Sequence, residues 1–277
     1  NLVFLRPLGP PTWDRQHRRS RRNGVPFRLD CKTMANDYFA FKRFTVRQPR
    51  SAMRVGTDGV LLGAWCDSAP AGGRMLDVGT GTGVIALILA QRNPSARIDA
   101  VEIDEGSCLD AEGNFAASPW AGRLTLYRRP FADFAAGCTV RYDRIVSNPP
   151  YFVASLKSPD PARTAARHAE SLSYADLAAG AARLLVPSGR LSVILPAETA
   201  CDFAASALNE GLYQVRALAV HTVPGGPVRR LCAEFSPRRQ DLQEETLVIE
   251  AEDRRGYSAR YKELTGDFSS KSEAKRS

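Results

Sequence analysis

The chain has 277 residues, of which 44% are hydrophobic and 25% charged, a composition typical of a folded globular protein. No stretch is long and apolar enough for a membrane span, and the six cysteines include no CxxC pair or neighbouring histidine that would indicate a zinc site or a disulfide framework. The three histidines and the absence of a Gly-x-Ser-x-Gly motif argue against a hydrolytic triad.

Residues 1–33 hold most of the positive charge. The whole chain has a net charge of +8, and this segment, rich in arginine and interrupted by Pro10-Pro11, accounts for six of those charges. It has no apolar periodicity, so we expect a disordered basic leader before a natural start at Met34, an organelle transit peptide being the alternative. Because the remainder carries only a small surplus, basicity is weak evidence for RNA binding.

From residue 74 onward, apolar runs typical of strands alternate with helical stretches. The expected strands are Arg74–Val78, Arg97–Ile103, Arg123–Tyr127, Tyr142–Ser147 and Gly189–Leu195. The expected helices are Gly83–Gln91, Glu105–Ala116, Tyr174–Leu185 and Glu198–Asn209. This alternation predicts a mostly parallel α/β sheet covered on both faces. The late runs Tyr213–Val220 and Leu231–Phe235, with no helix between them, predict an antiparallel edge.

A glycine-rich loop follows the first of these strands. Asp77 ends the strand, and Gly79, Gly81 and Gly83 lead into the next helix with the spacing G-x-G-x-G. Glycines allow a tight turn and close approach of a ligand at the carboxyl end of a strand, where open α/β sheets bind ligands. The dinucleotide fingerprint G-x-G-x-x-G would need a glycine at position 84, which is Val84 here.

Glu102 ends the next strand, about 20 residues further on. A carboxylate at this spacing accepts hydrogen bonds from the two hydroxyls of a ribose. The alternative is a solvent-facing carboxylate that caps the helix beginning near Asp104.

Asn148-Pro149-Pro150-Tyr151 directly follows the strand Tyr142–Ser147. The Asn148 amide oxygen and the Pro149 carbonyl can both accept hydrogen bonds from one planar NH₂ group, and Tyr151 can stack on the ring that bears it. An amine holder, a ribose-binding acid and a glycine loop without a pyrophosphate fingerprint together favour S-adenosyl-L-methionine (SAM) over NAD. We therefore expect Asn148, Pro149 and Tyr151 to act in catalysis, and Gly79, Gly81, Glu102 and Asn148 to lie at the cofactor.

These residues resemble the class I SAM-dependent methyltransferases. More narrowly, Phe41–Phe44, Ala52–Trp65, Ser118–Trp120, Asn148–Phe152 and Arg230–Pro237 resemble the bacterial tRNA1(Val) (adenine-37-N6)-methyltransferase family, and the similarity spans about residues 36–268. The resemblance implies a Rossmann-like, mostly parallel seven-stranded sheet with an antiparallel last strand and helices on both faces. It also implies one domain over 34–268, followed by a disordered tail over 269–277.

The resemblance further implies roles for individual residues. Gly56, Thr57 and Asp58 would hold the methionine end of SAM, and Asp77, Gly79, Gly81 and Glu102 would bind the cofactor. The family often carries an acid near the cofactor adenine where Pro130 stands here, so Phe131 and Asp133 are the candidates to replace it. Arg229 and Arg230 could contact phosphates, or they could be solvated strand-end arginines.

The implied activity is methylation of adenine N6 in the anticodon loop of a tRNA by a cytoplasmic, monomeric enzyme with no metal and no membrane partner. One alternative is a protein-glutamine N5-methyltransferase of release factors, but the roughly 40 residues between Met34 and Arg74 are too few for the helical domain of that family. Guanine-N2 methyltransferases of ribosomal RNA are a further option, and they bring an additional RNA-binding domain that is not evident here. A catalytically inactive RNA-binding scaffold of the same fold is the alternative from another class.

Overall fold

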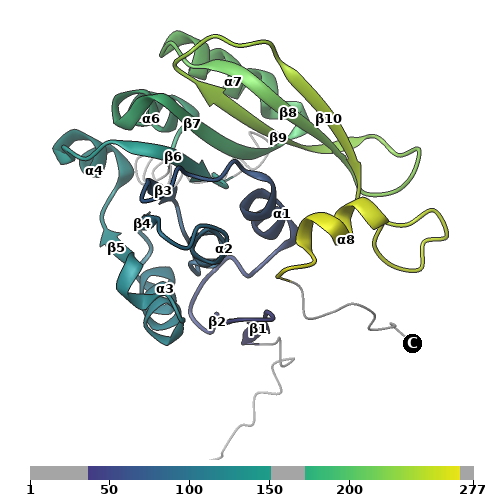
Figure 1. Ribbon diagram of the computed structural model, residues 1–277, viewed down its shortest axis with the longest axis horizontal. Helices are drawn as coiled ribbons and strands as arrows, with labels where there is room; N and C mark the ends of the chain where they lie inside the picture. The colour runs from purple at the N-terminus through teal and green to yellow at the C-terminus, as the bar shows by residue number, and fades with distance from the viewer. Residues whose placement is uncertain (1–36, 151–171, 269–277) are drawn as a thin grey trace, which may run out of the picture. The chain divides into compact units, whose positions relative to one another are not determined.

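A mixed β-sheet forms the centre of the computed structural model, which describes residues 37–150 and 172–268 (Figure 1). Its strand order is β10-β8-β9-β7-β6-β3-β4-β5. The strands are β3 (Arg74–Val78), β4 (Arg97–Glu102), β5 (Leu124–Arg128), β6 (Tyr142–Ser147), β7 (Leu185–Pro196), β8 (Tyr213–His221), β9 (Val228–Ser236) and β10 (Gln243–Val248). A separate hairpin pairs β1 (Tyr38–Ala40) with β2 (Thr45–Arg47).

Strand direction confirms the expected Rossmann-like sheet and adds one strand to it. Among the described strands of the central sheet, β9 alone runs antiparallel to its neighbours, β7 and β8. It lies inside the sheet rather than at its edge, because β10 pairs in parallel with β8 and makes an eighth strand. The sequence did not predict β10, because its first residues, Gln243, Glu244 and Glu245, are polar and lack the apolar pattern of a buried strand.

Helices cover both faces of the sheet, as expected (Figure 1). On one face lie α1 (Thr57–Trp65), α2 (Val84–Arg92), α3 (Glu105–Ala117) and α8 (Ala259–Thr265), and on the other lie α4 (Phe131–Gly137), α6 (Tyr174–Leu184) and α7 (Ala200–Asn209). Short 3-10 turns occupy Ala121–Arg123 and Ala197–Thr199. Alternate residues of β3 contribute to the two cores: Met75 packs on the α1/α2 side and Leu76 on the α4/α6 side.

Side-chain caps explain where several helices begin. Asp104 accepts a hydrogen bond from the Ser107 amide at 2.7 Å and starts α3. Ser173 accepts one from the Asp176 amide and starts α6, and Ser258 accepts one from the Tyr261 amide and starts α8. Each cap satisfies an amide that would otherwise lack a partner in the first turn.

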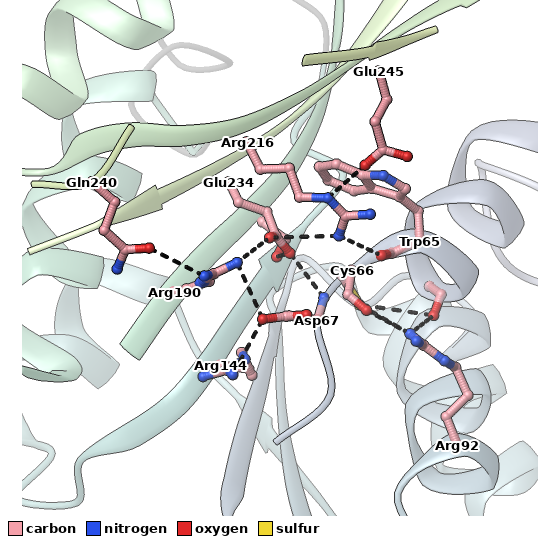
Figure 2. A network of polar contacts seen from close by, with 12 residues as sticks. Trp65, Cys66, Asp67, Arg92, Arg144, Arg190, Arg216, Glu234, Gln240 and Glu245 are labelled. Carbon is pink, nitrogen blue, oxygen red and sulfur yellow. Dashed lines mark hydrogen bonds and ion pairs between the residues drawn. The ribbon is translucent and has the colours of Figure 1, made fainter. Parts of the chain in front are cut away.

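A buried ion network fixes the end of α1 against the sheet (Figure 2). Glu234 of β9 is fully buried, and its carboxylate lies 3.0 Å from the Arg190 guanidinium. The same carboxylate accepts hydrogen bonds from the Asp67 amide at 2.8 Å and from the Ser192 hydroxyl at 3.0 Å. Because Asp67 directly follows α1, this network sets where the helix leaves the sheet.

The order of the strands reverses between β3 and β6. From β3 the chain proceeds outward to β4 and β5, and it then returns to β6 on the other side of β3. In open α/β sheets, ligands bind at the carboxyl ends of the strands beside such a reversal. The glycine loop after β3 and the Asn148 segment after β6 both lie there.

Candidate active site

The glycine loop makes a left-handed turn between β3 and α2. Gly79, Gly81 and Gly83 have φ angles of 69°, 56° and 83°, values that residues with a Cβ rarely adopt. The amides of Gly79 and Thr80 donate to the Val101 carbonyl of β4, at 2.9 and 3.1 Å. A Cβ at Gly79 or Gly81 would meet nothing within 4 Å, so the loop borders open space on the side where a ligand would lie.

Asp77 is buried at the base of this loop. Its Oδ2 accepts hydrogen bonds from the Thr80 hydroxyl at 2.6 Å and from the Ala86 amide at 3.0 Å, whereas its Oδ1 has no hydrogen-bond partner among the described residues. Burial raises the pKa of Asp77 to about 7, against the lowering effect of those two hydrogen bonds. A buried carboxylate with an unsatisfied oxygen fits a cofactor that carries positive charge, as the sulfonium and ammonium groups of SAM do.

Glu102, at the end of β4, binds backbone amides with both oxygens. Its Oε2 accepts from the Gly81 amide at 2.8 Å, and its Oε1 accepts from the amides of Ile103 and Asp104. The carboxylate thus ties the glycine loop to β4, and the helix cap itself is Asp104. Since a carboxylate offers about four acceptor sites, one site on Oε2 remains for a ribose hydroxyl.

The segment Gly56, Thr57 and Asp58 forms the start of α1. Gly56 is the N-cap residue and Asp58 lies in the first turn, where a negative charge is favourable. The Asp58 carboxylate lies 2.8 Å from the guanidinium of Arg230, at the start of β9. Arg230 is therefore engaged with α1, which argues against the phosphate contact considered for it from the sequence.

Asn148 and Pro149 follow β6 at the reversal point. Val78 pairs with Ser147 in the sheet, so Gly79 and Asn148 each directly follow one residue of this last pair. The Ser147 hydroxyl donates to the Val78 carbonyl at 2.8 Å and reinforces this register. Asn148 is partly buried and Pro149 is buried. Tyr151 lies outside the described residues.

Phe131 and Asp133 belong to the first turn of α4. The Phe131 ring is buried, with 6% of its surface exposed, and it occupies the space where a Cβ on Gly180 of α6 would stand. Asp133 is exposed. A contact from Phe131 to the cofactor adenine stays a prediction, and its packing between α4 and α6 disfavours it.

Sequence reasoning missed a row of α3 residues that holds the segment before α1. Asp110 accepts hydrogen bonds from the amides of Arg50 and Ser51, at 3.0 and 2.8 Å. Asn114, one turn later, donates to the Thr82 carbonyl at 2.9 Å and also pairs with the Arg47 backbone. The spacing of Asp110 and Asn114 could have indicated this role, because residues four apart on a helix share one face. The structure shows that both side chains are buried.

The described residues also define what this region lacks. Within 37–150 and 172–268, no group of three or more His, Cys, Asp or Glu side chains gathers in a way that could hold a metal ion. None of the described helices has the length and apolar character needed to cross a membrane.

Comparison with known proteins defines the class. The sequence model of the family "Methyltransferase small domain" matches residues 56–222, from the residue before α1 to the residue after β8. The crystal structure of a predicted O-methyltransferase of Agrobacterium tumefaciens has the same fold, with a TM-score of 0.62, 17% identity, and coverage of 76% of this chain and 96% of that one. The fold is that of a class I methyltransferase, a class whose methyl donor is SAM.

Closer relatives narrow the class. The tRNA1(Val) (adenine(37)-N6)-methyltransferases of Bacteroides fragilis and Trichodesmium erythraeum are each 44% identical to this chain, and the matches cover 85% of it and 98% of each relative. The enzyme of the same name from Edwardsiella ictaluri is 40% identical, over 83% of this chain and 92% of that one. This chain belongs to their family, which confirms the resemblance read from its motifs.

Proposed function

We propose that this enzyme transfers a methyl group from SAM to the exocyclic N6 of adenine in a tRNA, with adenine 37 of tRNA1(Val) as its target. The observation that carries the proposal is the position of Asn148 and Pro149 directly after β6, whose neighbour β3 leads into the glycine loop, in a chain that matches relatives of that name over nearly their whole length.

Asn148 and Pro149 would activate the nitrogen. Adenine N6 is a poor nucleophile because its lone pair is delocalised into the ring. If the Asn148 Oδ1 and the Pro149 carbonyl accept its two N–H hydrogens, the nitrogen becomes more tetrahedral and its lone pair turns toward the methyl group. The protein needs no strong base before transfer, because the methylated nitrogen is acidic enough to lose its proton afterwards.

Bound SAM supplies an electrophilic methyl group. In our proposal, Glu102 accepts a ribose hydroxyl on its remaining site, and Asp77 faces the positive charge. Gly56, Thr57 and Asp58 hold the methionine end near the first turn of α1, and Gly79 and Gly81 allow close approach of the backbone. Ile103, which follows Glu102 and is 48% exposed, offers apolar surface to the adenine ring.

The target base must leave its stack to reach Asn148, which costs least in a single-stranded loop. From the sequence we assign its stacking partner as Tyr151. A loop nucleotide such as position 37 meets this requirement, whereas a paired base would have to be extruded from a helix.

The Asn148→Ala variant tests the proposal. We expect the rate of N6-methyladenosine formation on a tRNA1(Val) transcript to fall by about 100-fold, because one of the two hydrogen-bond acceptors for the nitrogen is lost. Mass spectrometry of the nucleosides measures the product, and calorimetry with SAM should give an affinity within a few-fold of wild type. Asn209→Ala, at the exposed end of α7, is the matched control.

Assays with tRNA, with a glutamine peptide and with SAM alone separate the alternative functions. Methylation by Asn148→Ala at near wild-type rate would refute the role of this residue. Methylation by the wild type of a glutamine peptide from a release factor, but not of tRNA, would favour a protein-glutamine methyltransferase. No measurable SAM binding by the wild type would favour an inactive scaffold.

We also propose a monomer in the cytoplasm. The described cysteines are free thiols, which suits a reducing compartment, and tRNA is available there. Light scattering with and without tRNA measures the oligomeric state, and a stable dimer would contradict this part of the proposal.

A further inference from the structure

A hollow of about 450 Å³ lies beside the start of α1, at the carboxyl edge of the sheet. Its wall combines the first turn of α1 with the ends of β8 and β10 and the start of β9. The residues around it are Thr57, Asp58, Val220, Thr222, Arg229, Arg230, Ile249, Glu250 and Tyr257. Thr57, Asp58 and Arg230 belong to the contacts described above, and the other wall residues have no role in that site.

The hollow lies on the same edge of the sheet as Asn148. Arg230 pairs with Pro196 at the end of β7, and β7 is the neighbour of β6, which Asn148 follows. Since neighbouring strands are about 4.8 Å apart, the two to four spacings from β6 to β9, β8 and β10 separate Asn148 from the walls of the hollow by roughly 10–19 Å. A strand of RNA with one base at Asn148 can therefore place a nearby base in the hollow.

Its wall includes an aromatic ring held in place. Tyr257 is 43% exposed, and its ring packs against the buried Tyr261 of α8 with the centroids 4.7 Å apart. The backbone around Tyr257 is held by two contacts of Glu250. Glu250 forms an isolated β-bridge with Tyr257, and the Glu250 amide donates a hydrogen bond to the Thr222 carbonyl at 3.0 Å. A fixed, exposed ring is a platform on which a base can stack.

Charge inside the hollow favours a base over a phosphate. Arg230 is engaged with Asp58 at 2.8 Å, so it does not make that part of the wall strongly positive. Glu250 adds a carboxylate, which repels phosphate but accepts hydrogen bonds from the N–H groups of a base. Arg229, which is exposed, can meet the phosphates of the backbone outside.

We propose that this hollow binds a second nucleobase of the RNA substrate, close in sequence to the methylated adenine. Tyr257 stacks on that base and Glu250 accepts hydrogen bonds from its edge. The inference rests on the proposed function, because it assumes an RNA substrate, and it assigns to these residues the recognition of nucleotides near the target.

Kinetics with the full-length enzyme and the anticodon stem-loop of tRNA1(Val) test the proposal. We expect Tyr257→Ala to raise the KM for this RNA by about 10-fold, the loss of one base–aromatic stack, with SAM affinity unchanged. Glu250→Gln should raise the KM less. The matched controls are Tyr38→Ala, which removes a tyrosine that is 53% exposed on β1, and Glu252→Gln, which removes an exposed acid of the same loop as Tyr257.

Abasic RNAs identify the base that is bound. Stem-loops that lack one base at a time on either side of the target should include one on which wild type and Tyr257→Ala have the same KM. The proposal is overturned if Tyr257→Ala equals wild type on the intact RNA, or if its defect persists on every abasic RNA. It is also overturned if SAM affinity falls in parallel, because the hollow would then belong to the cofactor site.

Failure of the proposed function can be told apart from failure of the hollow proposal, because in the first case the wild type methylates no RNA. In that event, fluorescence anisotropy of the same labelled stem-loops still tests the hollow. Equal affinities of wild type and Tyr257→Ala for the intact RNA would refute it, and a weaker affinity of the variant that disappears on one abasic RNA would support it.

Discussion

Asp77 has an energetic cost in the protein without cofactor. Its carboxyl group is buried with one oxygen unpaired, and burial raises its pKa from 3.8 to about 7. The protonated form is therefore favoured by folding, and stability falls as the pH rises between these two values, by up to roughly 4 kcal/mol in total. A cationic ligand beside Asp77 would offset this cost.

We predict that Asp77→Asn flattens the pH dependence of thermal stability. Without SAM, the melting temperature of the wild type should fall from about pH 5 to about pH 8, because Asp77 ionises in a buried position. The variant lacks this titration, although Asp99, whose pKa burial also raises, leaves a residual slope in both proteins. Differential scanning fluorimetry across this range measures the difference, and parallel slopes would contradict the prediction.

Gly83 explains the departure from the dinucleotide fingerprint. Its φ is 83°, and a Cβ there would lie 2.5 Å from Cε1 of Phe115 in α3. The third glycine thus serves the close packing of the loop on α3, whereas Gly79 and Gly81 face open space. The spacing G-x-G-x-G differs from the fingerprint G-x-G-x-x-G because the residue that packs on the helix is Gly83, one position before the third glycine of the fingerprint.

One helix and one strand position the active-site edge. Asp110 and Asn114 of α3 hold the segment before α1, and Arg230 of β9 holds the first turn of α1 through Asp58. Gly106, one turn before Asp110, leaves room for the Arg50 carbonyl, which a Cβ would approach to 2.8 Å. The start of α1 is therefore placed by contacts with both α3 and β9.

At the other end of α1, we predict that Glu234→Gln lowers the free energy of unfolding by about 3 kcal/mol. The change removes the buried negative charge that Arg190 and Arg216 share, and it leaves these two arginines with only the more exposed carboxylates of Asp67 and Glu245 (Figure 2). Glu245→Gln is the control, because Glu245 also pairs with Arg216 but is 30% exposed, and it should cost less than about 1 kcal/mol. Urea denaturation measures both, and equal losses would refute the distinction.

At the scale of the whole molecule, we propose that residues 34–268 form one domain. The described strands and helices run from Tyr38 to Thr265. The pairing of β3 with β6 joins the two halves of the sheet into one continuous sheet. The expectations for residues 1–33 and 269–277 lie outside the described residues.

We predict that a protein of residues 34–268 melts within a few degrees of the full chain and binds SAM with the same affinity. The reason is that the proposed cofactor residues and both hydrophobic cores lie within this range. Scanning calorimetry and SAM titration of the two proteins provide the measurement. A clearly lower melting temperature would mean that flanking residues contribute to the fold.

Much of this protein could be predicted from local sequence. The strands Arg74–Val78 and Tyr142–Ser147 coincide with the observed ones, because a run of apolar residues between turn signals reports burial within a few residues. The glycine loop and the acid that ends β4 were equally readable, since backbone turns and strand ends depend on neighbours in the chain.

Only the tertiary structure decided which distant residues meet. Arg230 and Asp58 are 172 positions apart, β10 joins the sheet despite its polar residues, and Phe131 is buried between two helices. These outcomes depend on how strands pair in register and how side chains fill the space between layers. Neither is encoded within one short window of sequence, because the partners of each contact come from separate windows.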